Sequence, residues 1–389
     1  MTQRRLLFLV NEALFFTTHR MSVARAAREG GFEVHVAAPH EQEPVEVIEA
    51  NGFHYHPIPL IRSGTSIKGE LTLLMAFWRL LKRIKPDLTH HVAMKPVAYA
   101  GCLARLSRVP AVVHAVTGLG YLFIRDDLLS RTQRMIIMRL FRFALAHPNG
   151  RVIFQNPDDL DLFTKKAAVD PTIATIIRGT GVDMNRFVPV ATPRKRPVVM
   201  FPARVIGDKG VHEFVEAARQ LTGRGVVADF VIVGRTDPIN PTAVADETVR
   251  QWEREGILTW WGFREDIAAA LQQASIVCMP SYREGLPRVL IEAAACGLPI
   301  VTTDVPGCRE IVDDGVNGLL VPPRDGPATA AAIARLVDNP DLRRRMGEAS
   351  RAMTVAEYGV DDFVRRTLSV YAEVAPDIVA AGSGSEQDP

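Results

Sequence analysis

Short apolar runs alternate with amphipathic segments along most of the chain. The apolar runs predict buried strands, at Leu6–Val10, Val34–Ala38, Val109–His114, Arg151–Gln155, Val198–Phe201, Asp229–Gly234, Leu258–Gly262 and Ala274–Met279. The segments with apolar positions at helical spacing predict helices, at His19–Glu29, Val45–Asn51, Glu70–Lys85, Ser130–His147, Val211–Leu221, Thr329–Val337, Pro340–Ser350 and Asp361–Val374. Strands that are apolar on both sides and separated by helices indicate parallel sheets covered on both faces. The expected fold class is therefore α/β.

The length of 389 residues suggests two or three domains. A stretch rich in Pro, Thr and basic residues, Val190–Pro197, has the composition of a linker. We therefore expect a first domain over 1–188, a linker over 189–197 and a second domain over 198–360. Residues 376–389 are polar and rich in Gly, Ser and acidic residues, which predicts a disordered tail.

Composition and charge narrow the class of protein. The net charge is only +2, but residues 62–151 carry 15 Lys and Arg residues against 4 Asp and Glu residues, which suggests an anionic partner. The four cysteines show no CxxC pairing, so we expect a reduced, cytosolic protein without a structural zinc. No uncharged apolar run reaches the roughly 18 residues of a spanning helix.

The apolar run at the N-terminus argues against two further interpretations, a signal peptide and a dinucleotide-dependent dehydrogenase. The run ends at Asn11-Glu12 without a small-residue cleavage site, which favours a buried strand over a signal peptide. No GxGxxG motif follows it, which argues against a dinucleotide-dependent dehydrogenase.

The stretch Ser281–Gly297 predicts a strand, a short turn and a helix. The unpaired amides and the dipole of a helix N-terminus favour an anion such as phosphate, and Gly285 lets the backbone approach a ligand closely. Glu284 before the helix and Glu292 within it can accept hydrogen bonds from sugar hydroxyls on either side of a diphosphate. Spacing alone leaves open a solvated glutamate on an ordinary amphipathic helix.

A second candidate anion site follows the strand Val198–Phe201. Arg204 and Lys209 lie between that strand and the helix that begins at Val211. Two cations at a strand's carboxyl end, next to a helix N-terminus, can clamp a diphosphate.

These residues carry a resemblance to a known family. Glu284-x7-Glu292 within EGLPRVLIEAAACGLPIV, preceded by Arg204-x4-Lys209, resembles the signature of family 4 retaining glycosyltransferases of the GT-B fold, and the resemblance spans roughly residues 4–375. It implies two Rossmann-like parallel-sheet domains that face each other across a cleft, with a C-terminal helix over 361–375 packed on the first domain. It also implies a nucleotide-sugar donor and no requirement for a metal or other cofactor.

The resemblance assigns roles to individual residues of the second domain. Glu284 approaches the donor sugar as a catalytic residue, and Glu292 holds the ribose. The turn amides at Gly285 and Leu286 hold the diphosphate together with Arg204 and Lys209. The nucleotide base packs near Phe263.

In the first domain the resemblance points to a catalytic histidine and to an acceptor side. His114 is expected to face the donor sugar, although this chain has His114-Ala115 where many members have His-Asp and a lone histidine at a strand end is usually structural. His91-x3-Lys95-Pro96 and Thr117-Gly118-Leu119-Gly120 resemble a subgroup that extends lipid-linked sugars in surface-polysaccharide or glycoprotein-glycan assembly. Lys95, Thr117 and Gly118 are therefore expected on the acceptor side.

The function that the resemblance implies is a retaining transfer. A hexose or N-acetylhexosamine would move from a UDP-sugar to a hydroxyl of a polyprenyl-diphosphate-linked saccharide, with the leaving phosphate taking the acceptor proton. Two alternatives stay open: a nucleotide-sugar epimerase of the same fold, and a GT-B-like protein that binds nucleotide sugars without turnover. Asp159-Leu160-Asp161 spells a metal-binding DxD pattern, but its context predicts a helix start instead.

Two predicted helices carry the basic excess. Glu70–Lys85 places Arg79, Lys82 and Arg83 opposite an apolar face, and Ser130–His147 places its arginines opposite Ile136, Leu140 and Phe143. Each pattern fits a helix with a solvated basic face, or a helix that docks on an anionic membrane. With a lipid-linked acceptor, the second interpretation predicts a cytoplasmic protein bound peripherally to the inner face of the cell membrane.

Overall fold

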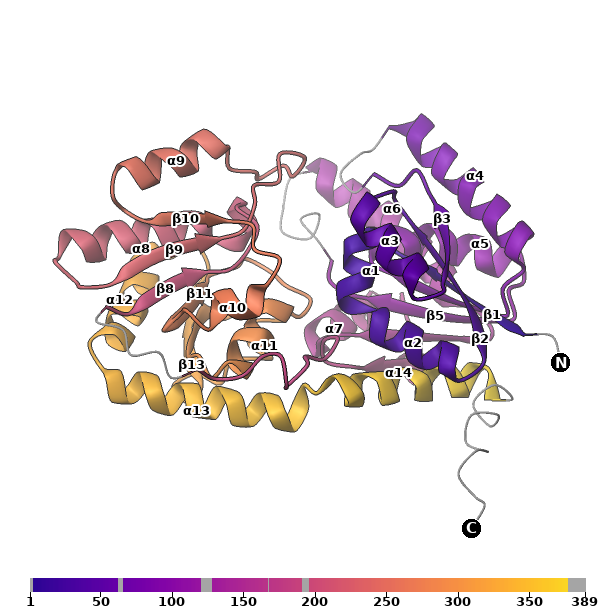
Figure 1. Cartoon of the computed structure of the whole chain (residues 1–389). Helices are drawn as coiled ribbons and strands as arrows, with labels where there is room; N and C mark the ends of the chain where they lie inside the picture. Colours follow the sequence, from indigo (N-terminus) through magenta and orange to yellow (C-terminus); the bar gives the residue numbers. More distant parts are fainter. Residues whose placement is uncertain (1–2, 62–65, 120–127, 167, 191–195, 377–389) are drawn as a thin grey trace, which may run out of the picture. The chain divides into compact units, whose positions relative to one another are not determined.

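The structure is a computed structural model that describes residues 3–61, 66–119, 128–166, 168–190 and 196–376, without the side chains of 128–131. The chain divides into two units. Unit 1 comprises Met1–Thr180 together with Asp361–Pro389, and unit 2 comprises Gly181–Val360. Figure 1 shows both units and labels many of their helices and strands.

Unit 1 contains a seven-stranded sheet in the order β3-β2-β1-β4-β5-β6-β7, and every strand pair is parallel. Its strands are β1 (Arg4–Leu9), β2 (Phe32–Ala38), β3 (His54–Pro57), β4 (Leu88–Val92), β5 (Ala111–Val116), β6 (Gly150–Phe154) and β7 (Ala174–Ile176). Its helices are α1 (Ala13–His19), α2 (Met21–Glu29), α3 (Gln42–Ala50), α4 (Ile67–Ile84), η1 (Pro96–Ala100), α5 (Gly101–Leu106), α6 (Leu128–Leu145), α7 (Pro157–Lys165), η3 (Pro171–Ile173) and α14 (Val360–Val374).

Alternate residues of β1 point to the two faces of this sheet. Leu6 and Phe8 belong to a core shared with α1, α2, α3 and α14, whereas Leu7 and Leu9 belong to a core shared with α4 and α5. The sheet is therefore buried on both faces, as its apolar strands predict. The C-terminal helix α14 is fixed to the sheet by Tyr371, whose hydroxyl lies 2.5 Å from Nδ1 of His90 on β4.

Unit 2 contains a six-stranded parallel sheet in the order β10-β9-β8-β11-β12-β13. Its strands are β8 (Val198–Phe201), β9 (Asp229–Val233), β10 (Thr259–Gly262), β11 (Ile276–Met279), β12 (Ile300–Thr303) and β13 (Gly318–Val321). Its helices are η4 (Gly207–Lys209), α8 (Val211–Gly223), α9 (Asp246–Arg254), α10 (Ile267–Leu271), α11 (Arg288–Ala295), α12 (Gly326–Val337) and α13 (Pro340–Glu357). Both sheets follow the Rossmann strand order, so the predicted pair of Rossmann-like parallel-sheet domains is confirmed.

The division between the units lies earlier in the chain than the sequence suggests. Residues 181–188, expected in the first domain, belong to unit 2, where the Val182 amide donates to Tyr358 O at 2.9 Å and Arg351 Nη1 donates to Phe187 O at 2.6 Å. Residues 191–195 of the expected linker and 377–389 of the expected tail lie outside the described residues.

The two basic helices expose apolar side chains in addition to their basic residues. On α6, Ile136 and Phe143 are exposed, whereas Phe141, Ala144 and Leu145 are buried. On α4, the expected residues Leu73, Phe77, Leu80, Leu81 and Ile84 are buried, but a second set of apolar side chains is exposed. Within the described residues, no helix combines the length and apolarity needed to cross a bilayer.

Candidate functional site

Four loops of unit 2 meet at the carboxyl edge of its sheet. They follow β8, β9, β11 and β12, and the order of the strands reverses between β8 and β11. In open α/β sheets, ligands bind beyond the carboxyl ends of the strands at such a reversal. Arg204, Lys209, Glu284 and Glu292 all belong to these loops or to the helices that follow them.

Glu284 lies at the centre of this group. Its Oε1 atom accepts a hydrogen bond from Lys209 Nζ and a second from Ser281 Oγ, the latter at 2.6 Å. Ser281 Oγ is 3.0 Å from the carbonyl of Asp208, so it also joins the β11–α11 turn to the β8–α8 loop. The structure thus brings Lys209 and Glu284, 75 residues apart in sequence, into one ion pair with little exposure of either side chain.

Glycines allow the loops to come this close. Gly210 has φ +77°, and a Cβ atom there would lie 2.0 Å from the carbonyl oxygen of Pro280. Gly307 has φ +80°, and its Cβ would lie 2.6 Å from the carbonyl oxygen of Gly285. Any larger residue would push the β11–α11 turn away from its neighbours on either side, so both positions need glycine.

Glu292 is buried on α11, about one turn after the helix begins at Arg288. Its Oε1 accepts a hydrogen bond from Arg288 Nε at 2.8 Å, one helical turn earlier. Burial raises the pKa of this carboxyl, and the Arg288 guanidinium opposes that shift. The sequence interpretation missed Arg288, although its spacing of four residues from Glu292 is the usual signal for an ion pair on a helix.

Arg204 pairs with a partner that the sequence interpretation also missed. Its Nη1 donates to Oδ2 of Asp237, a buried carboxylate in the loop after β9. A Cβ atom on Gly234, at the end of β9, would lie 2.0 Å from the Ala203 carbonyl oxygen, so this glycine lets the β8 and β9 loops touch. The signal for Asp237 is its place just after the predicted strand Asp229–Gly234, at the same edge as Arg204.

Two helices start at this edge without a side-chain cap. The N-cap residues are Gly210 for α8 and Pro287 for α11, and neither side chain accepts a hydrogen bond from the first turn. Pro287 therefore directly precedes α11, which begins at Arg288. The first-turn amides of such helices, with the positive end of the helix dipole, suit an anionic group. Gly285 and Leu286 are buried in the turn before α11.

Further polar residues surround the anion-binding edge. Tyr282 donates from its hydroxyl to Oε1 of Glu213 at 2.8 Å. The guanidinium carbon of Arg324 lies 4.7 Å from the centre of the Tyr282 ring. Asp208 is half-buried next to Lys209, and burial raises the pKa of its carboxyl. Lys209, Arg204 and Arg324 therefore lie at this edge among carboxylates that partly balance their charge.

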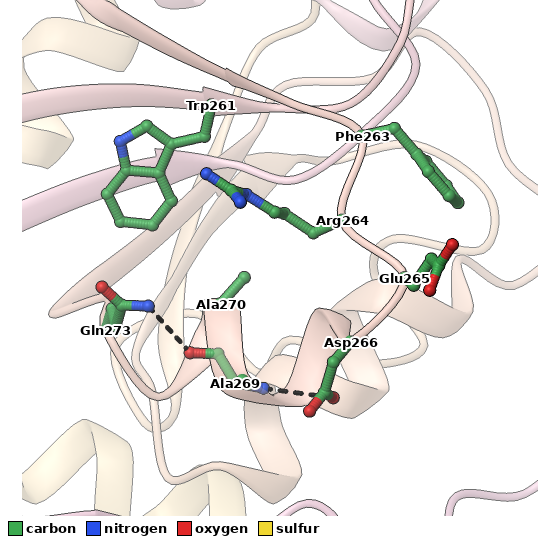
Figure 2. Close-up of a pocket in the computed structure, with 8 residues that line it drawn as sticks. All are labelled: Trp261, Phe263, Arg264, Glu265, Asp266, Ala269, Ala270 and Gln273. Atoms are coloured by element: carbon green, nitrogen blue, oxygen red, sulfur yellow. Dashed lines mark hydrogen bonds between the residues drawn. The ribbon is translucent and has the colours of Figure 1, made fainter.

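Phe263 lies at the same edge, after β10. Its ring is 54% exposed and stacks under the guanidinium of Arg235 at 5.5 Å. It borders a surface pocket of about 550 Å³ that Figure 2 shows, with Trp261 and Phe263 on opposite sides of Arg264. Asp266 caps α10 by accepting a hydrogen bond from the Ala269 amide and pairs with Arg186 at 3.2 Å. An exposed ring at this position can stack on a planar group.

The role expected for His114 needs correction. The strand β5 runs on to Val116, so His114 lies within the strand and not at its end. Its side chain is fully buried, its Nδ1 atom lies 3.3 Å from Nδ1 of His91, and burial lowers its pKa to about 3. An imidazole enclosed in this way cannot face a donor sugar, so in this structure His114 is a core residue.

The other predicted residues of unit 1 lie nearer to its surface. Thr117 and Gly118 follow the carboxyl end of β5 and are half-buried, and Gly118 has φ +131°. Lys95, which follows β4, donates from Nζ to Glu70 Oε1 and to the carbonyl of Ile61, both at 2.7 Å. Their position at the carboxyl ends of neighbouring strands agrees with a binding edge.

The DxD segment has the helix start that its context predicts. Asn156 caps α7 by accepting a hydrogen bond from the Asp159 amide at 2.7 Å, and its Nδ2 donates to Asp159 Oδ2 at 3.1 Å. Asp161 is exposed and pairs with Lys165 one turn later. Across the described part of the chain, no cluster of three or more His, Cys, Asp or Glu side chains is arranged to hold a metal ion.

Two family models match the chain in tandem. The model described as "Glycosyl transferase 4-like" matches residues 5–156, and the model described as "Glycosyl transferases group 1" matches residues 185–353. The second match contains Arg204, Lys209, Glu284 and Glu292.

Relatives and solved structures agree with these matches. The chain is 25% identical, over 96% of its length and all of the relative, to the N,N'-diacetylbacillosaminyl-diphospho-undecaprenol alpha-1,3-N-acetylgalactosaminyltransferase of Campylobacter jejuni. It is also 25% identical, over 72% of its length and 74% of the relative, to the UDP-Gal:alpha-D-GlcNAc-diphosphoundecaprenol alpha-1,3-galactosyltransferase of Escherichia coli.

Its fold is similar to that of sucrose-phosphate synthase from Thermosynechococcus elongatus, with a TM-score of 0.77 and 19% identity over 96% of this chain and all of that one. The Anabaena protein HepE in complex with UDP-glucose matches with a TM-score of 0.72 and 19% identity, over 94% of this chain and 99% of that one. The chain therefore belongs to the family 4-like glycosyltransferases of the GT-B fold.

Proposed function

We propose that this glycosyltransferase moves a hexose or N-acetylhexosamine from a UDP-sugar to a hydroxyl of a polyprenyl-diphosphate-linked saccharide, with retention at the anomeric carbon and without a metal ion. The main support for a UDP-sugar donor is the cluster of residues at the carboxyl edge of the unit 2 sheet. There Lys209 and Arg204 lie with Glu284, Glu292 and the uncapped starts of α8 and α11.

This cluster matches the charge pattern of a nucleotide sugar. A diphosphate needs cations and amide donors, which Lys209, Arg204 and the two helix starts supply. The ribose and the sugar need hydrogen-bond acceptors, for which we propose Glu292 and Glu284 respectively. Phe263 is proposed to stack on the uracil ring, and the amides at Gly285 and Leu286 to bind phosphate oxygens.

In the proposed reaction, the acceptor hydroxyl attacks the anomeric carbon from the face that the diphosphate leaves. The bond from the acceptor oxygen to the anomeric carbon forms as the bond from that carbon to the phosphate oxygen breaks. The electron pair of the broken bond stays on UDP, and the acceptor proton passes to the departing phosphate oxygen. Lys209 and Arg204 stabilise the charge that develops on that phosphate, which is where preorganised electrostatics lowers a barrier most.

The acceptor half rests on the relatives. The names of the two relatives described above each include a saccharide linked to diphosphoundecaprenol. The name of the Escherichia coli enzyme also includes its UDP-sugar. A saccharide on such a lipid stays in the bilayer. We therefore propose that the protein works peripherally at the inner face of the cell membrane, where the basic residues of 62–151 meet anionic lipid.

Product analysis tests the proposal against its two rivals. A panel of UDP-sugars is first ranked by thermal shift, because a ligand that binds only the folded protein raises its melting temperature. The stabilising donor is then incubated with a polyprenyl-diphosphate saccharide. Free UDP with a lengthened acceptor is expected. An isomerised donor would identify an epimerase, and stabilisation without any product would identify a binding protein.

A further inference from the structure

The helix α4 has two apolar faces, and only one of them is buried. Leu73, Phe77, Leu80, Leu81 and Ile84 pack into the core against the sheet of unit 1. Ile67, Leu71, Met75 and Trp78 are exposed, by 78%, 54%, 48% and 49% respectively. Single exposed apolar residues are ordinary, but four on one helix call for an explanation.

The four exposed residues form one stripe. Their spacing of four, four and three residues places them on a single side of an α-helix, over three turns. We call Ile67, Leu71, Met75 and Trp78 the α4 stripe. It lies apart from the core-facing positions, so α4 presents one face to the sheet and a second apolar face to its surroundings.

Basic residues border the α4 stripe. Lys68, Arg79, Lys82 and Arg83 are exposed on the same helix beside or beyond it. The helix has one acidic residue, Glu70, which is half-buried and paired with Lys95. The exposed face of α4 is therefore apolar in the middle and positive at its margin. A tryptophan and lysines at the edge of an apolar stripe are typical of a helix that lies at a membrane interface.

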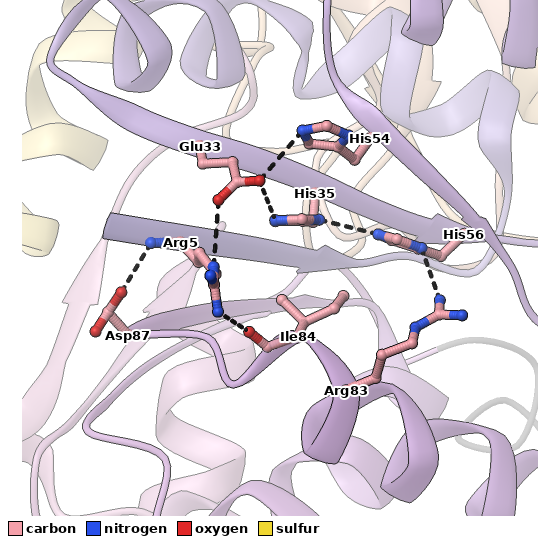
Figure 3. Close-up of polar contacts among 8 residues, drawn as sticks. All are labelled: Arg5, Glu33, His35, His54, His56, Arg83, Ile84 and Asp87. Atoms are coloured by element: carbon pink, nitrogen blue, oxygen red, sulfur yellow. Dashed lines mark hydrogen bonds and ion pairs between the residues drawn. The ribbon is translucent and has the colours of Figure 1, made fainter. Parts of the chain in front are cut away.

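The rest of unit 1 holds α4 in place, so its exposed stripe is a feature of the folded protein. The guanidinium of Arg5 on β1 donates to the carbonyl of Ile84 at the end of the helix, at 2.8 Å. Arg83 Nη2 lies 3.0 Å from Nδ1 of His56 on β3. Figure 3 shows both contacts from the C-terminal end of α4 to the sheet. With its core face also buried, α4 can offer the stripe without detaching.

We infer that the α4 stripe inserts into the interfacial region of an anionic lipid bilayer, with Lys68, Arg79, Lys82 and Arg83 bound to the headgroups around it. This inference deepens the proposed function, because a lipid-linked acceptor requires the enzyme to come to the bilayer. It differs from attachment by charge alone, because an inserted stripe keeps part of its affinity when salt screens the headgroups. Charge complementarity selects anionic lipid over a second copy of the chain, whose α4 surface is equally basic.

Three triple variants of the full chain separate the contributions. The stripe variant is Ile67→Gln/Leu71→Gln/Met75→Gln, and the charge variant is Lys68→Gln/Arg79→Gln/Lys82→Gln. The matched control, Ile239→Gln/Val316→Gln/Val355→Gln, removes exposed apolar residues of unit 2 instead. All six α4 positions are solvent-exposed, so we expect each variant to fold.

Binding is measured by flotation with vesicles of phosphatidylcholine and phosphatidylglycerol, at low salt and at about 0.5 M salt, where screening is nearly complete. The stripe variant should bind about tenfold more weakly, or worse, at both salt concentrations. The charge variant should lose affinity mainly at low salt, and the control should match the wild type. Brominated lipid should quench part of the tryptophan emission, and Trp78→Phe should remove that part.

Several outcomes would overturn the inference. Binding of the stripe variant to vesicles as tightly as the control is one such outcome, and quenching that survives Trp78→Phe is another. Sedimentation without lipid could instead show a dimer that the stripe variant dissociates, which would assign the stripe to a second copy. Transfer to a short-chain soluble acceptor is measured in parallel. Vesicle binding without any transfer would contradict the proposed function alone, and transfer without vesicle binding would contradict this inference alone.

Discussion

Lys209 donates a hydrogen bond from Nζ to Oε1 of Glu284, and Ser281 Oγ donates to the same oxygen at 2.6 Å. The pair joins the loop after β8 to the turn after β11, at the point where the strand order reverses. An ammonium held by a carboxylate stays charged and oriented, and it can add a phosphate oxygen to its contacts without a large movement. Glu284 thus positions the cation that we propose for the leaving diphosphate.

Replacement of Lys209 should mainly slow the chemical step. Lys209→Met keeps most of the side-chain volume but removes the cation beside the departing phosphate. We expect kcat to fall by roughly 10²–10³, the usual effect of losing one preorganised stabilising group, with a smaller change in KM. Steady-state kinetics with the stabilising UDP-sugar checks this. Lys165→Met, which removes an exposed lysine from its pair with Asp161, is the control and should keep wild-type rates. Near-normal kcat in Lys209→Met would remove this lysine from the reaction.

The two glutamates should give different kinetic signatures. Glu292→Gln removes the negative charge and replaces one of the two acceptor oxygens proposed for the ribose with an NH2 donor. The ribose binds equally in the ground and transition states, so KM for the donor should rise with little change in kcat. Glu284→Gln should lower kcat, because it alters contacts to the sugar and to Lys209. Glu348→Gln breaks an exposed pair with Arg344 at the same spacing as Arg288–Glu292 and is the matched control. Equal, small effects from Glu284→Gln and Glu292→Gln would count against both assignments.

The fold and the position of the candidate site at the carboxyl edge of the unit 2 sheet follow from local sequence patterns. Apolar runs between amphipathic segments predict parallel sheets, and the carboxyl ends of parallel strands share an edge. That is enough to expect Arg204 and Lys209 near the Glu284 turn. Asp237 and Ser281 were missed, because their roles depend on which loops touch. Those contacts are set by glycines such as Gly210 and Gly307, whose close neighbours are distant in sequence.

The errors in unit 1 have similar physical causes. His114 was expected at a strand end, but β5 continues to Val116 because Ala115 and Val116 suit a buried strand as well as the residues before them do. On α6, the helical period placed Ile136 and Phe143 on one apolar face, and both are exposed in the structure. The period identifies an apolar face but cannot say whether the protein covers it. The exposed α4 stripe went unnoticed for the same reason.

Activity should survive chelation of divalent metals. We expect this because the carboxyl edge of the unit 2 sheet offers positive charge without a metal. Arg204, Lys209 and the starts of α8 and α11 are available there to the diphosphate. Initial rates should be unchanged within about twofold when EDTA is present in excess, because no step of the proposed reaction uses a metal. Asp161→Asn should also leave kcat and KM unchanged, since this carboxylate pairs only with Lys165 among the contacts described above. A complete loss with EDTA that Mn²⁺ or Mg²⁺ restores would revive Asp159 and Asp161 as ligands.

Acid should weaken the attachment of α4 to the sheet through the histidines of β2 and β3. Arginine only donates, so Arg83 Nη2 fixes His56 Nδ1 as an acceptor, and the other ring nitrogen of His56 then carries the proton toward Nδ1 of His35, 3.0 Å away. Figure 3 shows this chain of contacts, which ends where His35 Nε2 lies 3.5 Å from Glu33 Oε1. This arrangement of hydrogen bonds requires the His56 ring to be neutral. Burial, followed by the nearby His35 and Arg83, lowers the pKa of His56 to about 4, and burial also lowers the pKa of His35.

The sign of the stability change follows from these pKa shifts. Both histidines take up protons more readily in the unfolded chain, whose histidine pKa is about 6.5. The free energy of unfolding should therefore be fully retained above pH ~6.5 and fall as the pH drops from ~6.5 toward ~4. Because His56 is only half-buried, we expect a loss on the order of 1 kcal/mol. Urea unfolding across this range measures it, and His56→Gln should flatten the pH dependence relative to the wild type. His40→Gln, at an exposed histidine, should not. If the free energy of unfolding of the two variants depends on pH to the same extent, the His56–Arg83 contact does not make the attachment of α4 sensitive to pH.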